Sequence, residues 1–212
     1  MKITVLCSSN LHPVNAYLQF WINKHQSSHR INIVRSKAEL IGGDLLFLIS
    51  CSEMLKKSDR SAYKKTLVIH ASDLPNGRGW SPHIWQIIEG ATKVTLTLLE
   101  AEDKVDSGPI WKQIQIGIKK DALWDEINNL IFSAEISLMD FAVENIHSIQ
   151  AKPQSKKIEP TYYPKRTPED SKISSNLSIS EQFDLIRICD PHRFPAYFEL
   201  HGYKYIIKVE KV

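Results

Sequence analysis

One histidine and one aspartate stand where side chains could perform acid–base chemistry. His70 ends the apolar, β-branched run 66–70, and a turn rich in Ser, Asp, Pro, Asn and Gly follows it. Asp106 lies in an acidic loop, directly before Ser-Gly-Pro. A carboxylate beside an imidazole raises the imidazole pKa and fixes its orientation, so the pair can stabilise an oxyanion and move one proton. Each residue alone is explained at least as well by structure: a capped core histidine and an Asp-initiated turn.

Both residues are expected at strand ends of one sheet. Alternate residues of a strand share a face, so Val68 and His70 point the same way. Ligands of open α/β sheets bind outside the carboxyl ends of the strands. We therefore expect His70 and Asp106 to meet where two neighbouring strands end.

The hydrophobic pattern predicts an α/β fold with a Rossmann-like, mainly parallel sheet. Strands alternate with helical segments, which is typical of βαβ units. Short apolar or alternating runs predict strands at 2–7, 31–34, 44–50, 66–70, 94–100 and 108–118.

Three segments of the first 150 residues show helical signals. Apolar residues at helical spacing predict helices over 14–25 and 122–149, and Asp121 is expected to cap the second. A helix over 81–90 is predicted with Ser81 as its N-cap, Pro82 at the first position and a glycine at its end.

The chain changes character after residue 150. Residues 151–175 contain four prolines, many charges and few aliphatic residues, which is typical of an extended connection. A capped helix is predicted over 178–189, and two alternating strands around a His-Gly turn over 196–212. We expect a catalytic domain, residues 1–150, followed by a linker and a small α+β subdomain, residues 151–212.

The composition limits the class of protein. With 42% hydrophobic and 24% charged residues among 212, the chain is an ordinary globular one. A net charge of +3 does not favour nucleic acid, which normally binds a clustered basic face. The three scattered cysteines have no metal-ligand spacing, and we expect reduced thiols in a cytoplasmic protein without a metal. No apolar run suits a signal peptide or a membrane span.

Several motifs occur in the order of one known family. HASDLPNGRGWSP, WQIIEG and VTLTLLEAEDKVDSGPI resemble the N10-formyltetrahydrofolate-dependent formyltransferases, whose pattern runs Asn-x-His-x-Ser-x-Leu-Pro, Arg-Gly, Val-Thr and Asp-x-Gly. YYPKRTPEDSKI and LIRICDPHRFPAYFELHGYKYII resemble the branch that modifies sugars. The short chain is similar to small enzymes that formylate amino sugars for pseudaminic-acid-type surface glycans, and to the formyltransferase domain of a gramicidin synthetase.

The resemblance implies transfer of a formyl group from N10-formyltetrahydrofolate to the primary amine of a nucleotide-linked amino sugar, by analogy a 4-amino-4,6-dideoxyhexose. It places His70 and Asp106 at catalytic positions. The third position, Asn in the family, is Val68 here, which has no hydrogen-bond donor. Losing one oxyanion donor typically lowers the rate by about 10²–10³, so Ser72 is a candidate replacement.

The resemblance also implies two binding regions and a set of partners. The pterin is expected in a slot whose backbone groups come from the loop after the third strand, Ile49, Ser50, Cys51, Ser52 and Met54. The acidic loop 100–106, with Glu100 and Asp103, is expected to close the other side. The acceptor is expected to contact Ser9, Asn10, His12, Arg78, Trp80, Tyr163, Lys165 and Arg166. We expect no metal, nucleic acid or membrane partner, and a homodimer to which the strands of 196–212 supply an edge.

Three alternatives stay open. A methionyl-tRNA-type formyltransferase fits the N-terminal motifs, but the modest charge and short C-terminal region do not suit it. Hydrolysis of formyltetrahydrofolate would replace the amine by water. A folate- or nucleotide-binding module that has lost catalysis is favoured by Val68 and opposed by the retained His70 and Asp106.

Overall fold

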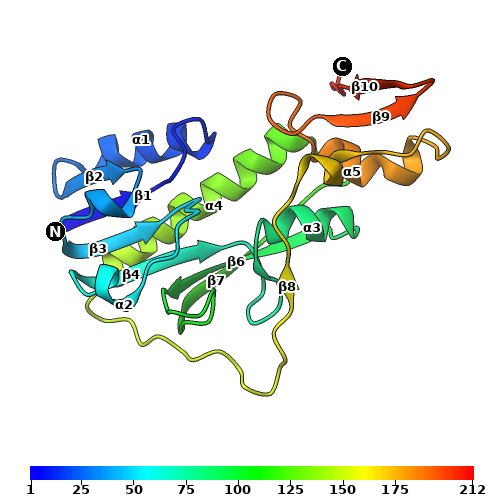
Figure 1. The fold of residues 1–212 in the computed structure, drawn as a ribbon. Helices are drawn as coiled ribbons and strands as arrows, with labels where there is room; N and C mark the ends of the chain where they lie inside the picture. Colours follow the sequence, from blue (N-terminus) through cyan, green and yellow to red (C-terminus); the bar gives the residue numbers. More distant parts are fainter.

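A six-stranded sheet forms the centre of the molecule in the computed structural model, which describes all residues 1–212 (Figure 1). The strand order is β2-β1-β3-β4-β6-β7. The first four strands run parallel, β6 is antiparallel to β4, and β7 is antiparallel to β6. Their bounds are β1 Lys2–Leu6, β2 Arg30–Val34, β3 Gly43–Leu48, β4 Tyr63–His70, β6 Lys93–Glu100 and β7 Ile110–Gly117. The predicted α/β fold with a mainly parallel sheet is confirmed.

Helices α1 (Val14–His25) and α4 (Trp124–Asn145) cover one face of this sheet (Figure 1). Val14, Leu18 and Trp21 are buried at helical spacing, and Trp21 packs edge-on against Phe47 of β3. Residues of β3 that face the two helices, such as Phe47, belong to the main core cluster. Leu46 faces the other side of the sheet and belongs to a separate cluster.

The opposite face of the sheet holds His70. It pairs with Thr97 of β6, and both side chains are buried. The short elements are η1 (Lys37–Glu39), α2 (Lys57–Arg60), α3 (Pro82–Ile88), whose Ile87 joins the main core cluster with α1 and α4, and the two-stranded pair of β5 (Arg78–Gly79) with β8 (Tyr162–Tyr163). The long connection after α4, drawn yellow in Figure 1, brings β8 to β5 from far along the chain.

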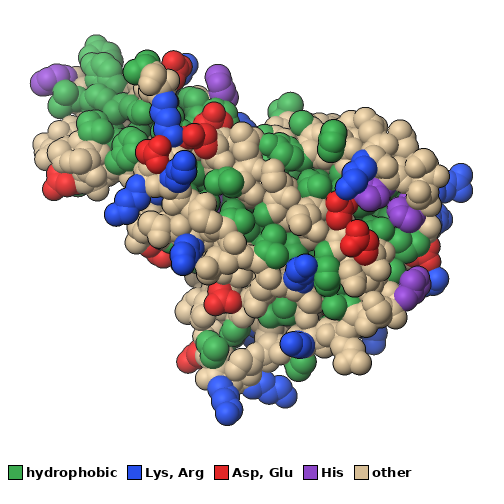
Figure 2. All heavy atoms as spheres, turned by 180° about the vertical axis from the view of Figure 1, so that it is seen from behind, with side chains coloured by type: hydrophobic (Ala, Val, Ile, Leu, Met, Phe, Trp, Pro, Cys, Tyr) green, Lys and Arg blue, Asp and Glu red, His purple; other side chains and the backbone are tan.

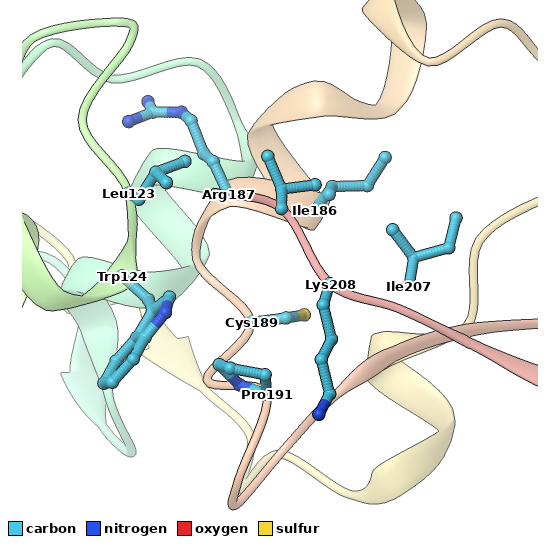
Figure 3. Close-up of a pocket in the computed structure, with 9 residues that line it drawn as sticks. Leu123, Trp124, Ile186, Arg187, Cys189, Pro191, Ile207 and Lys208 are labelled. Carbon is cyan, nitrogen blue, oxygen red and sulfur yellow. The ribbon is translucent and has the colours of Figure 1, made fainter. Parts of the chain in front are cut away.

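The last forty-odd residues form a small α+β piece beside α4. It comprises η2 (Pro168–Ser171), η3 (Ser180–Gln182), α5 (Phe183–Arg187), β9 (Ala196–Leu200) and β10 (Tyr203–Ile207), the last two forming the predicted hairpin. Between this piece and the start of α4 lies a cavity of about 10 Å³ (Figure 3). That volume accommodates at most about one water molecule, so it is a packing feature.

The hairpin exposes apolar side chains on a strand whose outer edge is unpaired. Leu200, Tyr203, Tyr205 and Ile206 are all exposed. In Figure 2, hydrophobic side chains gather at the corner of the molecule that the hairpin occupies. In the two-stranded sheet, β10 pairs only with β9.

Two predicted helix caps are wrong. Helix α4 begins at Trp124, where the Leu123 N–H donates to the Glu126 carboxylate, and not beside Asp121. Arg187 donates to the carbonyls of Lys119 and Ala122 and so holds Asp121 in a turn before the helix.

The second wrong cap is at α3. Ser81 precedes this helix but has left-handed backbone angles (φ 45°, ψ 48°), and its side chain makes no capping bond. An N-cap needs an extended backbone, which explains the difference. Pro82 and Gly90 do mark the two ends of the helix, as predicted.

None of the helices combines the length and the apolar character needed to cross a membrane. No three His, Cys, Asp or Glu side chains are grouped in a way that could hold a metal ion. All three cysteines are free thiols.

Candidate active site

His70 and Asp106 lie together on the sheet face opposite α1 and α4. His70 Nδ1 is 3.6 Å from Asp106 Oδ2, and the two side chains are only 8% and 10% exposed. The other ring nitrogen, Nε2, is 2.8 Å from the Gly77 carbonyl oxygen. Because a carbonyl oxygen only accepts, Nε2 carries a hydrogen, and Nδ1 is the nitrogen that can take up or release a proton.

The two residues do not meet as neighbouring strand ends, so that part of the prediction is wrong. Strands β4 and β6 are antiparallel, so the carboxyl end of β6 pairs with Leu67 and not with His70. Asp106 reaches His70 through the β6–β7 loop, in which its own backbone is left-handed (φ 49°). Its Oδ2 accepts the Gly79 N–H at 2.9 Å, which orients the carboxylate.

Two residues from distant segments fix the loop that carries Asp106. Gln154 Nε2 donates to the carbonyls of Asp106 and Gly108, at 2.7 and 2.9 Å. Gln154 Oε1 accepts from Arg78, whose guanidinium is buried and also bonds the Tyr162 hydroxyl. Arg78 was expected to contact the acceptor. The structure instead shows it only 5% exposed, and its bonds to Gln154 and Tyr162 fasten the tail to β5.

Val68, at the position of the family's Asn, offers no donor to an oxyanion. Val68 packs against the small apolar cluster around Leu46 and Leu48. Ser72, just beyond the strand, is 2% exposed, and its Oγ has no hydrogen-bond partner. Its carbonyl accepts from Thr97 Oγ1 at 2.7 Å, which fixes the backbone beside His70. A buried hydroxyl without a partner is a free donor at the site.

The residues expected to hold the pterin fall into two walls. Ser50, Cys51 and Ser52 follow β3, and Ser50 turns the chain with a positive φ of 47°. Further along, Met54 and Asp103 line opposite sides of a cleft of about 580 Å³. Arg60 joins the two walls by donating to the Leu55 carbonyl and to the Asp103 carboxylate.

Two of the expected pterin residues point away from the cleft. Glu100 pairs with Leu67, so its side chain lies on the helix-covered face, where it accepts from Lys65 and Trp111. Its prediction as a folate contact is wrong because strand residues alternate in direction. Ile49 is 1% exposed, and its N–H bonds the Leu6 carbonyl.

The residues expected at the acceptor site occupy two places. Ser9, Asn10 and His12 follow β1, where the first two are exposed and His12 packs edge-on against Phe132. The other residues lie on or after the paired strands β5 and β8. Trp80 holds Lys165 Nζ over its ring at 5.0 Å, and Tyr163 stacks on Trp85 and donates to Glu89. Tyr163 therefore has a packing role instead of an open stacking face.

His83 is a site residue that the sequence did not reveal. It lies in the first turn of α3, and its Nδ1 is buried without a partner. Burial lowers the pKa of His83 to about 4, and His70, His12 and Arg166 act in the same direction. These three neighbours come from separate segments, and only the fold brings them together.

Curated relatives share part of this chain. It is 26% identical over 160 residues to a methionyl-tRNA formyltransferase of Clostridium acetobutylicum, which covers 74% of the chain and 52% of that protein. It is 33% identical over 126 residues to a methionyl-tRNA formyltransferase of Thermodesulfovibrio yellowstonii, which covers 56% of the chain and 39% of that protein. The chain thus spans about half, or less, of the length of these relatives.

Solved structures share the fold over nearly the whole chain. A methionyl-tRNA formyltransferase of Clostridium thermocellum has a TM-score of 0.82 at 21% identity, covering 96% of this chain and 90% of that one. HypX of Aquifex aeolicus in complex with tetrahydrofolic acid has a TM-score of 0.77 at 19% identity, over 96% of this chain and 36% of that one. A sugar N-formyltransferase of Shewanella has a TM-score of 0.72 at 17% identity, over 100% and 99%.

The family itself is settled by a sequence match. The family model described as "Formyl transferase" matches residues 19–143, which is more than half of the chain and includes His70 and Asp106. The predicted formyltransferase family is therefore confirmed. Its branch is not resolved, because the relatives include both methionyl-tRNA formyltransferases and sugar N-formyltransferases. This chain belongs to the formyl transferase family.

Proposed function

We propose that this protein transfers a formyl group from N10-formyltetrahydrofolate to the primary amine of a nucleotide-linked amino sugar. The observation that carries the proposal is the buried pair of His70 and Asp106, 3.6 Å apart, within the part of the chain that matches the family. The tetrahydrofolate complex of the Aquifex HypX, which shares the fold, supports folate as the co-substrate.

The proposed chemistry moves one acyl group and one proton. The amine nitrogen forms a bond to the formyl carbon while the bond from that carbon to folate N10 breaks. One proton leaves the amine and one arrives on N10, so the products are a formamide and tetrahydrofolate. The residues must stabilise charge on the formyl oxygen and pass on that proton.

His70 and Asp106 suit these two tasks. The Gly77 carbonyl holds the Nε2 hydrogen, so Nδ1 exchanges the proton. At 3.6 Å, Nδ1 and Oδ2 are not directly hydrogen-bonded, and each keeps capacity for a reacting atom. The protonated His70, with the Asp106 carboxylate beside it, is proposed to stabilise the developing oxyanion. Ser72 is proposed as the neutral donor that replaces the family Asn.

We place the pterin between the segment 50–54 and Asp103, next to the cleft that Met54 and Asp103 line. The two walls are tied by Arg60, which suits a preformed slot for a flat ring. The acceptor is proposed to lie on the other side of His70, near Ser9, Asn10, His12 and Arg166. The protein is proposed to work as a homodimer through the β9–β10 hairpin, whose edge and apolar surface are uncovered.

The sugar acceptor is supported by end-to-end fold similarity to sugar N-formyltransferases. The Shewanella protein and a 4-N formyltransferase of Francisella tularensis match 100% of this chain and 99% and 98% of their own. A methionyl-tRNA acceptor is the second candidate, because the curated relatives are methionyl-tRNA formyltransferases. The net charge of +3 argues for the smaller substrate.

The test is a competition among acceptors. Purified protein and N10-formyltetrahydrofolate are incubated with a panel of UDP- and dTDP-linked amino sugars, with initiator methionyl-tRNA, or with no acceptor. We expect one amino sugar to gain the mass of a formyl group. Formylation of the tRNA alone, formate release without an acceptor, or folate binding without any product would each contradict the proposal in favour of a different alternative.

A further inference from the structure

Three buried side-chain nitrogen atoms lack hydrogen-bond partners: Nε of Arg78, in β5, Nδ1 of His83, in α3, and Nε of Arg166, in the segment after β8. His83 lies close enough to both His70 and Arg166 to sense their charges. Arg166 already uses Nη2 for the Asp170 carbonyl and the Ser171 hydroxyl, so its side chain is held in place while Nε stays free. Buried polar atoms in proteins are nearly always paired, and an orphan of this kind indicates a missing ligand.

The permanent charges that act on the rings of His83 and His12 are those of two arginines. The groups that act on the His83 imidazole are His70, His12 and Arg166, and Arg193 acts on His12. Burial and these neighbours hold the pKa of both His83 and His12 at about 4, so both rings are neutral at pH 7. No carboxylate is among the groups that act on the two rings. The one carboxylate at the site, Asp106, faces His70.

We propose that His83, His12 and Arg166 form a subsite that binds the diphosphate of the nucleotide-linked acceptor. This inference rests on the proposed function and deepens it, because it states which part of the acceptor binds beside the catalytic pair. Phosphate oxygens accept hydrogen bonds and carry negative charge, whereas the unpaired atoms here are nitrogens in a cationic corner. Arg166 supplies a permanent charge, and His83 and His12 each become a further donor by taking up a proton from solvent beside the bound anion.

The location favours a small phosphate compound over a polynucleotide. The orphan nitrogens of His83 and Arg166 are buried, and they are not spread along an exposed basic face. Nucleic-acid backbones are bound mainly by exposed, clustered Lys and Arg residues. A diphosphate held here would leave the sugar amine within reach of His70 and Asp106.

Binding of a diphosphate should bring a proton with it. The anion supplies the counter-charge that the imidazoles lack, and an opposite charge nearby raises an imidazole pKa. A neutral His83 in the free protein therefore becomes protonated in the complex. The proton uptake is a property that a merely structural histidine would not show.

The experiment is calorimetry of the full chain with UDP and with inorganic pyrophosphate at pH 7, in two buffers that differ in ionisation enthalpy. We expect the wild-type protein to take up a proton with either ligand. His83→Gln should bind about tenfold more weakly and lose most of this uptake, and Arg166→Gln should bind about tenfold more weakly. The matched controls are His147→Gln and Arg30→Gln, whose side chains are exposed on other surfaces.

A second measurement does not depend on any variant folding. NMR titration of the wild-type histidine resonances should show a higher His83 pKa with UDP than without it. Absence of binding of both ligands, affinities unchanged in both variants, or no proton uptake would overturn the subsite. Diphosphate binding through His83 without any formylated sugar would overturn the proposed function alone. Formylation with an unchanged acceptor KM in both variants would overturn the subsite alone.

Discussion

At the scale of single residues, the surroundings of His70, the proposed catalytic histidine, are set by two neighbours. The Gly77 carbonyl accepts from Nε2 at 2.8 Å, and the Asp106 carboxylate stands 3.6 Å from Nδ1. Asp106 is in turn oriented by the Gly79 N–H and by Gln154, which bonds its carbonyl. The histidine therefore has its Nε2 hydrogen fixed and its Nδ1 facing a carboxylate, which suits an acid–base role.

The Ser72 hydroxyl should replace the amide of the family Asn. In Ser72→Ala we expect kcat to fall by about 10², with the KM for folate little changed, because one oxyanion donor is lost. The check is steady-state kinetics with saturating acceptor, beside a thermal melt that shows the variant to be folded.

Val68→Asn provides the complementary experiment. It restores the family residue on the strand face that His70 shares, so it should raise kcat only slightly if Ser72 already supplies the donor. A gain of about 10² in Val68→Asn, together with no loss in Ser72→Ala, would contradict the role given to Ser72.

The sequence predicted His70 and Asp106 but could not describe all that surrounds them. Glu100 was misassigned because the direction of a strand residue depends on register, and the register of β6 is visible only in the fold. His83 and Gln154 were missed because their signal is an unpaired buried atom and a set of long-range bonds. A sequence pattern shows neither of these.

At the scale of elements, the pairing of β5 with β8 holds the segment after α4 against the turn that follows His70. Gly79 allows the two strands to approach this closely. Its φ is 97°, and a Cβ atom there would lie 2.5 Å from the Tyr163 carbonyl oxygen. Gly90 also has a positive φ, of 88°, but has nothing within 4 Å of the same position. Comparing substitutions at the two glycines therefore distinguishes the effect of backbone strain from the effect of close packing.

Gly79→Ala should therefore destabilise more than Gly90→Ala. Both variants carry the strain of a left-handed alanine, but only the first pushes β8 away from β5. We expect a melting temperature lower by about 5 °C or more in Gly79→Ala than in Gly90→Ala, and faster tryptic cleavage in the segment 151–166. Equal melting temperatures and equal cleavage would show that the close approach of β8 does not matter.

Glu135, in α4, makes the stability of the folded protein depend on pH. Burial raises the pKa of this carboxyl to about 8, and its Oε2 has no partner. The folded state thus binds the proton more tightly than the unfolded chain, whose ordinary value is 4.5. The stability from this group is fully present below pH 4.5 and is lost as the pH rises towards 8.

Glu135→Gln should remove this loss. We expect the variant to melt about 5 °C or more above the wild-type protein at pH 9, with a smaller difference at pH 5. Thermal melts across this range test it, with Glu144→Gln, exposed on the same helix, as the control. A parallel decline of Glu135→Gln and wild-type stability with pH would show that Glu135 is not the group responsible.

Most elements could be predicted because their patterns are local. The helix over 14–25 has its apolar residues at helical spacing, and it is found at those bounds. The hairpin has alternating strands around a His-Gly turn, and it is also found. The cap at Asp121 failed because Arg187, 65 residues from the carbonyl of Ala122, holds that turn. Local patterns cannot show such a contact.

At the scale of the whole molecule, the β9–β10 hairpin is the surface that a second copy should cover. The free edge of β10 can pair with the same edge of another chain about a twofold axis. We expect the wild-type protein to sediment as a dimer and Ile206→Asp to sediment as a monomer. Phe20→Asp, at an even more exposed apolar position on α1, should stay dimeric. A monomeric wild-type protein would contradict the proposed dimer.

The most direct test of the account is single-turnover formyl transfer in His70→Asn and Asp106→Asn, with the amino sugar that the wild-type protein accepts. Both variants should fold, as judged by their melting curves, and both should transfer the formyl group slower by about 10² or more. A rate close to that of the wild-type protein in either folded variant would contradict the claim that this imidazole and carboxylate perform the reaction.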